Sequence, residues 1–191
     1  MYTITSEALS LVEASELAVG AYSSEDSVES IDFINQCRPI EGYLRYIEDF
    51  NLTYTNGFFA RCKDTLFICI SGSNKRSHWA LNLNRSRTVL NKNDRHLSRM
   101  HVHSGFLRGA NLIQTKVNYP EHAMKHVINL DNYKRIVFVG HSLGGAIASI
   151  LSLLFSYTHI TELYRFGCPR VGDSIFNLNL QLRTDVIKTV K

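Results

Sequence analysis

The fold is decided by the stretch KRIVFVGHSLGGA, which covers Lys134 to Ala146. Residues 136–139 are apolar and mostly β-branched, which predicts a buried strand. A glycine-rich turn follows, and the apolar run from Ala146 to Phe155 consists largely of good helix formers. The stretch therefore predicts a strand and a helix that are joined by a very tight turn.

Within this turn, Gly140, Ser142 and Gly144 form the pattern Gly-x-Ser-x-Gly. Between a strand and a helix the pattern is typical of the nucleophile elbow of serine hydrolases, which holds a serine hydroxyl at the top of the sheet. Side chains at the glycine positions would collide with the strand and the helix. An ordinary strand-to-helix turn is the alternative, but the flanking strand and helix favour a catalytic serine. We expect His141, the variable position of the pattern, to point sideways.

The 191 residues fit one domain, and an apolar content of 45% is enough for a sizeable core. The formal charge of +4 is modest and does not by itself indicate a nucleic-acid partner. None of the four cysteines has the spacing of a metal site, and Cys69 lies in an apolar, strand-like run. We therefore expect a single domain over residues 1–191, with no cofactor and no metal.

The N-terminal sequence MYTITSE lacks the basic and apolar regions of a signal peptide. No run of 18 apolar residues occurs, so we expect no transmembrane helix. These features leave the localisation unknown. A reducing, cytoplasmic compartment is the default expectation, and secretion by a route without a cleaved signal stays open.

Strand-like and helix-like segments alternate along the chain. We expect further helices at residues 6–22, 26–34, 107–130 and 174–182. Tyr119-Pro120 should break the third of these helices, and Asp173 should cap the fourth. We expect strands at residues 51–55, 57–62, 65–70, 161–166 and from 187 onward, while residues 43–50 are ambiguous. Lys63-Asp64 should turn an antiparallel hairpin. The alternation predicts an α/β fold with a largely parallel sheet behind this hairpin.

The stretch from Lys75 to Arg99 contains seven basic residues and one acid, Asp94. A solvated loop face is the simpler interpretation of such a run. The alternative is transient docking on anionic phospholipid, with Trp79 as an interfacial anchor. Aromatic residues are not interleaved along the run, so we do not expect nucleic acid to bind there.

Several blocks together resemble the class 3 lipases, the fungal-lipase-like branch of the α/β-hydrolases. The matching blocks occur in the family's order, and they are Ile70-Ser-Gly-Ser73, Trp79, Val102-His-Ser-Gly-Phe106, Gly140 to Ala146 and Phe166-Gly-Cys-Pro-Arg-Val-Gly-Asp173. The resemblance extends from about Asn51 to Lys191 and implies an α/β-hydrolase fold with a mostly parallel central sheet. One departure is Ser71, which stands where the family usually has arginine.

The resemblance implies that Ser142 is the nucleophile of a lipase acting on acylglycerol or phospholipid esters. The backbone N–H groups of Leu143 and Ser73 would form the oxyanion hole, with the elbow built from Gly140, His141 and Gly144. Residues 74–84, including Trp79, would form the lid. His103 matches a family histidine that packs near the site and is not the catalytic base.

A serine nucleophile needs a base and an orienting acid, which follow it in the order Ser, Asp or Glu, His in α/β-hydrolases. His159 is the only histidine after Ser142, and it lies near the far end of the elbow helix. The family pattern places the acid a few residues past Lys191 and the histidine later still. Asp173 matches a capping position, and Asp185, which precedes the last strand, is a weaker candidate for the acid.

We therefore expect the chain to lack the C-terminal segment that carries the rest of the triad. Two readings stay open. The chain is a C-terminally truncated form of a lipase, or it is a catalytically incomplete protein that binds lipid or a partner without turnover. A serine peptidase or thioesterase on the same scaffold is a third, weaker hypothesis, because the other blocks resemble lipases.

Overall fold

A computed structural model describes residues 11–22, 45–52, 55–72, 86–118 and 128–191, with the backbone alone for residues 45–52, 55 and 118. Two predicted features, the helix over residues 26–34 and the break at Tyr119-Pro120, lie outside these residues. The same is true of Ser73, of Trp79 and of the other residues of the predicted lid.

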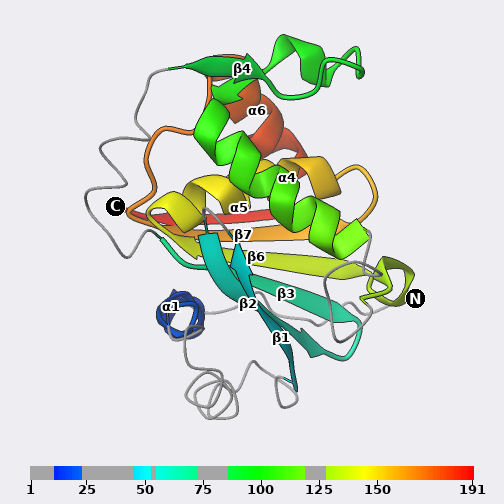
Figure 1. The fold of residues 1–191 in the computed structure, drawn as a ribbon, viewed down its shortest axis with the longest axis vertical. Coiled ribbons are helices and arrows are strands. Elements are labelled where there is room, and N and C mark those ends of the chain that lie inside the picture. The colour runs from blue at the N-terminus through cyan, green and yellow to red at the C-terminus, as the bar shows by residue number, and fades with distance from the viewer. Residues whose placement is uncertain (1–10, 23–44, 53–54, 73–85, 119–127) are drawn as a thin grey trace.

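A mixed sheet of six strands forms the centre of the part of the chain that the structure describes (Figure 1). Its strands, in spatial order, are β1 (Arg45–Leu52), β2 (Thr55–Cys62), β3 (Thr65–Ile70), β6 (Arg135–His141), β7 (Ile160–Phe166) and β8 (Val186–Val190). The pairs β1–β2 and β2–β3 are antiparallel, whereas β3, β6, β7 and β8 are mutually parallel neighbours. The predicted parallel sheet behind an antiparallel hairpin is confirmed, and the hairpin turns at Lys63, where φ is 52°.

The start of the sheet differs from the expectation. Residues 43–50 were ambiguous by pattern and residues 51–55 were expected to form a strand, but β1 runs from Arg45 to Leu52. The register of β1 against β2 shifts between Tyr46 and Glu48. A bulge of this kind adds a residue to one strand and breaks the alternation of apolar and polar side chains. Because this alternation is the sequence signal of a strand, β1 could not be recognised from the pattern of its residues.

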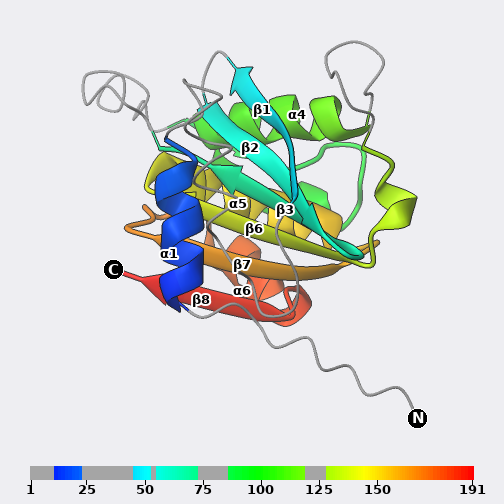
Figure 2. The same cartoon turned by 90° about the horizontal axis from the view of Figure 1, so that it is seen from below.

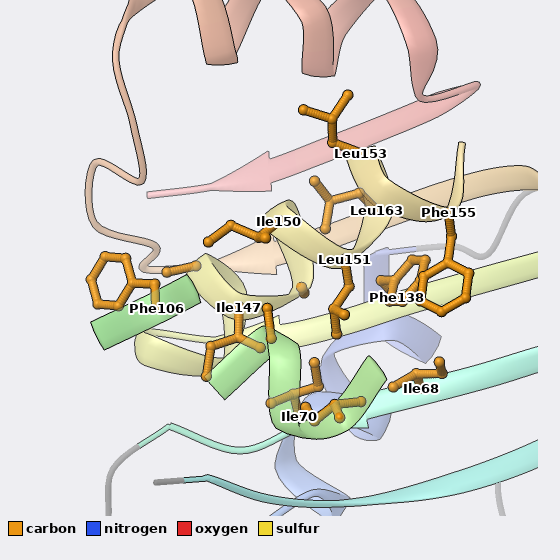
Figure 3. Packing of buried hydrophobic residues seen from close by; sticks show 14 of the residues in the cluster. Ile68, Ile70, Phe106, Phe138, Ile147, Ile150, Leu151, Leu153, Phe155 and Leu163 are labelled. Carbon is orange, nitrogen blue, oxygen red and sulfur yellow. The ribbon is translucent and has the colours of Figure 1, made fainter. Parts of the chain in front are cut away.

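In the described part of the chain, one face of the sheet is covered by α4 (Ser104–Asn118), α5 (Leu143–Phe155) and α6 (Ser174–Arg183) (Figure 1). Helix α5 is buried almost throughout, and its side chains pack on the strands beneath it (Figure 3). Ile147, Ile150 and Leu151 join Ile70 and Phe138 in the larger hydrophobic core. Each fully buried side chain of this size contributes about 1.5–3 kcal/mol relative to exposure. The apolar run after the elbow is therefore the central helix of the fold.

Helix α1 (Leu11–Gly20) covers the opposite face of the sheet (Figure 2). Ala14, Leu17 and Ala18 pack there against apolar side chains of the strands. The predicted helix is confirmed over residues 11–20. Its two valines, Val12 and Val19, are 67% and 62% exposed. Small alanine side chains, instead of the valines, let the helix backbone approach the sheet.

Short elements occupy the end of the stretch that was expected to be a polar loop. The strands β4 (Arg87–Val89) and β5 (His101–His103) pair antiparallel, and the 3-10 helix η2 (Leu97–Arg99) lies between them. A further 3-10 turn, η4 (Leu130–Asn132), precedes β6. Within residues 86–103, Leu90, Leu97 and Met100 are buried in the core, which anchors this segment although most of its other residues are polar.

Among the residues that the structure describes, no helix combines the length and the apolar character needed to cross a membrane. The architecture is an α/β fold in which helices flank both faces of a mostly parallel sheet. In such sheets the carboxyl ends of the parallel strands form one edge, where ligands usually bind.

Candidate active site

Ser142 lies at this carboxyl edge, between the end of β6 and the first residue of α5. Its backbone has φ 53° and ψ −118°, a conformation that a residue with a side chain rarely adopts. Its N–H donates to the carbonyl of Phe166 at the end of β7, and its own carbonyl accepts from Ala146 N–H. The neighbouring strand and the first turn of the helix therefore hold the strained residue in place.

The two glycines of the motif are needed for steric reasons. A Cβ on Gly144 would lie on the carbonyl oxygen of Ile70 and 2.7 Å from that of Ser71. A Cβ on Gly140 would lie 2.6 Å from the backbone nitrogen of Gly145. These distances are to backbone atoms, which cannot move aside as a flexible side chain can. The structure confirms the predicted tight turn between a strand and a helix, and it shows that the start of the helix lies against the end of β3.

Among the described residues, the N-terminus of α5 has no side-chain cap at Ser142. The Ser142 side chain makes no capping hydrogen bond to the helix, although serine is a favoured cap at such positions. The first N–H groups of a helix have no intrahelical partner, and the helix dipole adds partial positive charge there. Leu143, the first residue of α5, is half-buried beside this end. The arrangement suits a group that carries or develops negative charge.

The loop after β3 meets the elbow at the same place. Gly72 is buried, and a Cβ placed on it would lie 3.3 Å from the Ser142 Cβ and 3.0 Å from the carbonyl oxygen of His141. Ser71, the position where the family usually has arginine, is also buried, and its N–H and hydroxyl both reach the Asn56 carbonyl. The fold thus brings the loop that leads into Ser73 against the elbow, while Ser73 itself lies outside the described residues.

A tyrosine that no sequence motif singled out completes this cluster. The hydroxyl of Tyr22, two residues beyond α1, lies 2.7 Å from Nδ1 of His141. Burial raises the pKa of Tyr22, and a hydrogen bond from the Gly72 backbone opposes this shift. His141 is exposed and directed sideways, as expected, and its other ring nitrogen faces Gly167, where φ is 53°.

His159 and Asp185 lie far from the elbow. His159 follows the C-terminal end of α5, where Nδ1 contacts the Thr158 hydroxyl at 2.7 Å. The 13-residue helix α5 separates it from Ser142, a length of about 20 Å. Asp185 precedes β8 and accepts a hydrogen bond from Thr161 N–H at 2.9 Å. Asp185 therefore lies at the amino edge of the parallel strands, whereas Ser142 lies at their carboxyl edge. Asp185, the weaker candidate for the triad acid, is too far from Ser142 for that role.

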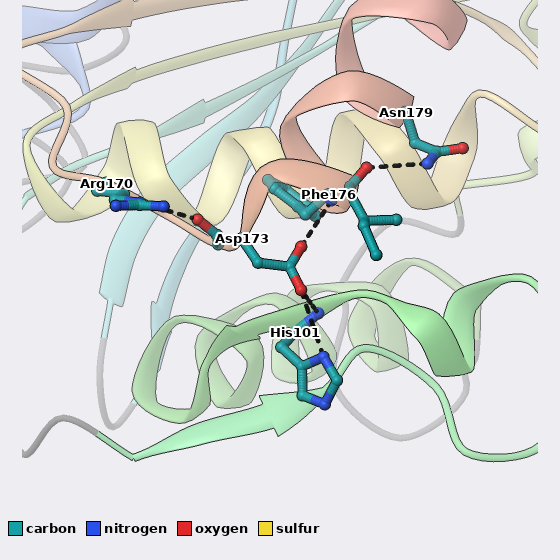
Figure 4. A network of polar contacts seen from close by, with 7 residues as sticks. His101, Arg170, Asp173, Phe176 and Asn179 are labelled. Carbon is teal, nitrogen blue, oxygen red and sulfur yellow. Dashed lines mark hydrogen bonds and ion pairs between the residues drawn. The ribbon is translucent and has the colours of Figure 1, made fainter.

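Asp173 caps helix α6, as predicted (Figure 4). One carboxylate oxygen accepts from Phe176 N–H at 2.8 Å, and the other accepts from His101 N–H at 3.0 Å and contacts the His101 ring. Partial burial acts to raise the pKa of Asp173, but the hydrogen bonds from the Phe176 and His101 backbones outweigh it and lower the pKa. This carboxylate is committed to joining α6 to β5.

His103 packs on a neighbouring aromatic ring. Its ring lies 4.4 Å, centroid to centroid, from that of Phe106, and its Nδ1 accepts from Gly105 N–H at 3.1 Å. The other ring nitrogen is buried and has no hydrogen-bond partner among the described residues. His78, His122 and His126 lie outside the described part of the chain. No group of three or more histidine, cysteine or acidic side chains that could hold a metal occurs within that part.

We compared the sequence and the fold with those of known proteins. The family model of the class 3 lipases matches residues 67–190, which is more than half of the chain. A fungal lipase–inhibitor complex is similar in fold, with a TM-score of 0.66 and 23% identity over 94% of this chain and 68% of that one.

Two further solved structures have the same fold. A Rhizomucor miehei lipase–propeptide complex has a TM-score of 0.62 and 23% identity, over 94% of this chain and 58% of that one. A mono- and diacylglycerol lipase from Aspergillus oryzae has a TM-score of 0.63 and 19% identity, over 94% and 70%. The chain thus spans between 58% and 70% of the length of these three proteins.

Because the solved structures are less than 25% identical to this chain, they support only the fold. The assignment of the chain to a family depends on the family model. The match begins within β3 and ends with β8, so it includes the elbow, the Gly72 loop and the Asp173 cap. On this evidence the chain belongs to the class 3 lipase family.

Proposed function

We propose that this protein hydrolyses carboxylic esters of lipids with Ser142 as the nucleophile. The observation that carries the proposal is the position of Ser142, which has a positive φ at an uncapped helix N-terminus. A strained backbone persists only where the surrounding structure enforces it, and such strain concentrates at functional sites. A serine that served only as a turn or a cap would need neither feature.

In the proposed reaction the Ser142 oxygen attacks the acyl carbonyl carbon and passes its proton to a base. The carbonyl oxygen becomes an oxyanion, which accepts hydrogen bonds from the N–H groups of Leu143 and Ser73. Collapse expels the protonated alcohol and leaves an acyl-enzyme, which water then hydrolyses. Each preorganised oxyanion donor contributes about 3–4 kcal/mol to the transition state in comparable sites.

The base and its orienting acid stay a prediction. In the part of the chain that the structure describes, no hydrogen bond to Ser142 Oγ is found, and His159 lies beyond the other end of α5. The family resemblance implies an Asp and then a His that follow β8. The proposal therefore gives roles to Ser142, Leu143 and Ser73. The general base stays a prediction from the family resemblance.

An acylglycerol or a phospholipid is the proposed substrate. Support comes from the family and from the similar structures, two of which are described as a fungal lipase and a mono- and diacylglycerol lipase. We also propose that Trp79, with the rest of residues 74–84, belongs to a lid over the acyl site.

We further propose transient contact of the basic stretch with an anionic lipid surface. In its described part, Arg87, Lys92, Arg95 and Arg99 are exposed. The one acid, Asp94, accepts hydrogen bonds from the backbone N–H groups of Leu97 and His96, which lower its pKa. Charge reversal of Arg95 and Arg99 should weaken co-sedimentation with phosphatidylglycerol vesicles; unchanged binding would count against the contact.

Binding of lipid without turnover is the second candidate function. The observation that favours it is the lack of a described hydrogen-bond partner for Ser142 Oγ, because a serine hydroxyl is a weak nucleophile without a base. Co-sedimentation with lipid vesicles in the absence of any ester cleavage would support this alternative over hydrolysis.

The test is turnover of p-nitrophenyl esters of several acyl lengths. It uses the 191-residue chain and, where the gene encodes residues after Lys191, the extended chain. Ser142→Ala should reduce turnover to background, since loss of such a nucleophile costs on the order of 10⁶ in kcat. Ser174→Ala, at the exposed first residue of α6, is the matched control and should keep full activity. Undiminished turnover by Ser142→Ala would exclude the proposed nucleophile.

A further inference from the structure

Tyr22 reaches the elbow from the opposite face of the sheet. Helix α1 packs across the strands there through Ala14, Leu17 and Ala18 (Figure 2). The chain leaves the helix at Gly20, and Tyr22 N–H still donates to the carbonyl of Val19. This docking fixes where the Tyr22 ring can lie, although 119 residues separate it from His141 in the sequence.

The phenol oxygen of Tyr22 contacts both segments of the candidate site. It lies 2.7 Å from His141 Nδ1, and it also lies against Gly72, whose backbone acts to lower the pKa of Tyr22. The approach to Gly72 is so close that a Cβ on that residue would lie on the phenol oxygen. A glycine at position 72 is thus required for the tyrosine to reach both partners.

The chemistry of the phenol oxygen allows it to join both segments. A tyrosine hydroxyl can donate one hydrogen bond and can also accept, so it can pair with His141 Nδ1 whichever ring nitrogen carries the imidazole proton. Burial raises the pKa of Tyr22, and the Gly72 backbone opposes this shift, as expected for an oxygen that lies against that backbone.

This link lies where the sheet no longer holds the two segments together. The parallel pairing of β3 with β6 ends at Ile70 and Gly140. Gly72 and His141 come after that last pair, and each directly precedes a residue with a proposed role, Ser73 on one side and Ser142 on the other. Donors to an oxyanion must keep their geometry to within about 0.5 Å to be effective.

We propose that Tyr22 is a positioning residue of this site, whose phenol oxygen holds the Gly72 loop and the His141 elbow in register so that the oxyanion donors on either side are preorganised. This inference rests on the proposed function and extends it to the N-terminal segment, which lies outside residues 67–190 matched by the family model. Tyr22 acts through its two neighbours and does not contact the reacting atoms.

The experiment compares Tyr22→Phe with Tyr157→Phe. The first variant keeps the ring and removes only the hydroxyl. The second does the same at a 40%-exposed ring beyond the far end of α5, where Arg183 stacks on it. Two readouts are taken, the kcat and KM of ester hydrolysis in the chain form that turns over, and the ¹⁵N spectrum of the His141 ring, assigned with His141→Gln.

We expect Tyr22→Phe to lower kcat about 10- to 100-fold with little change in KM, because misplacement of about 1 Å has effects of this size. The His141 Nδ1 signal should move, because Tyr22→Phe removes the hydroxyl that lies 2.7 Å from this nitrogen. Tyr157→Phe should leave both readouts unchanged. A Tyr22→Phe variant with wild-type kcat and a wild-type ¹⁵N spectrum would overturn the proposal.

Failure of the proposed function would look different. In that case the wild-type protein, in every chain form, would show no turnover, whereas a failure of the Tyr22 inference leaves wild-type turnover intact. If the wild-type protein does not hydrolyse the ester, the ¹⁵N spectrum of the His141 ring alone tests the contact between Tyr22 and His141. An unchanged His141 spectrum in Tyr22→Phe then refutes the link between Tyr22 and His141, and a shifted Nδ1 signal supports it.

Discussion

Helices α5 and α6 begin in opposite ways, although both follow a parallel strand of the same sheet. Helix α5 starts from Ser142 with φ 53°, and the serine side chain makes no capping hydrogen bond. Helix α6 starts from Asp173 with φ −75°, and its carboxylate accepts from Phe176 N–H and from His101 N–H. The N-terminus of α5 thus has a strained backbone and no side-chain cap, whereas the N-terminus of α6 has a relaxed backbone and is capped by a carboxylate.

The difference separates a structural helix start from a reactive one. At α6 a resident carboxylate satisfies the N–H groups and joins the helix to β5. At α5 a Cβ on Gly140 or Gly144 would collide with backbone atoms, and among the described residues the Ser142 side chain leaves the helix N-terminus without a cap, which suits charge that develops on a bound molecule. The three predictions that follow test this contrast, in order of decreasing expected effect.

The largest effect should come from removing the N–H of Leu143. Leu143→Pro deletes this donor at the first helical position, where proline is otherwise tolerated. If the N–H stabilises an oxyanion, kcat should fall about 10²- to 10³-fold. The measurement is ester turnover on protein that circular dichroism shows to be folded.

Two control variants accompany this substitution. Leu143→Ala removes the same side chain and keeps the N–H, and Ser174→Pro makes the equivalent change at the first residue of α6. Both should retain most of the activity. Equal losses in Leu143→Pro and Leu143→Ala would show that the side chain, and not the donor, matters.

A smaller effect is expected at the occupied N-terminus. Asp173→Ala should lower the free energy of unfolding by about 1 kcal/mol at pH 7, as is usual for loss of a cap. The pKa of Asp173 is lowered in the folded protein. Its stabilisation is therefore complete above the unfolded pKa of about 3.9 and is lost as the pH falls through the lower folded value.

Urea unfolding at a series of pH values measures this dependence. The stability gap between the wild type and Asp173→Ala should narrow as the pH falls below about 4. Asp131→Ala, at an exposed acid of η4, is the control and should show little gap at any pH. A gap for Asp173→Ala that stayed constant down to pH 2 would contradict the role assigned to the carboxylate.

The smallest effect concerns strain at the open N-terminus. Ser142→Gly removes the side chain that disfavours φ 53°, which relieves about 1–3 kcal/mol, and it adds backbone freedom to the unfolded chain, which costs about 0.4–1 kcal/mol. The two ranges leave a net stabilisation between about zero and 2.6 kcal/mol, and we expect a value in the lower part of this range in urea unfolding. Ser174→Gly, in α6, should destabilise instead, because glycine disfavours a relaxed helix. A destabilised Ser142→Gly would show that the turn is not strained.

Much of the fold could be predicted because its core elements carry strong local patterns. The apolar run of β6 and α5, the hairpin at Lys63 and the Asp173 cap each depend on residues close in sequence. Strand β1 was missed because a bulge interrupts its alternation. Strands β4 and β5 have three residues each, too few to establish a period.

The candidate site was predictable only in part, for a related reason. Gly140, Ser142 and Gly144 lie within five residues, so one motif contains them. The contact of Tyr22 with His141 joins residues 119 positions apart, and it exists only because α1 docks on the far face of the sheet. No local pattern in a single sequence encodes such a contact, and only the packed structure brings it into view.

The central claim, that the open N-terminus of α5 holds a reactive serine, is tested most directly by fluorophosphonate labelling read by intact mass and peptide mapping. The 191-residue chain and any extended form should be treated in parallel with Ser142→Ala. The account predicts one adduct, on Ser142, and none on Ser174 at the occupied N-terminus of α6. A folded protein without any adduct in either chain form, or one that is still labelled after Ser142→Ala, would contradict it.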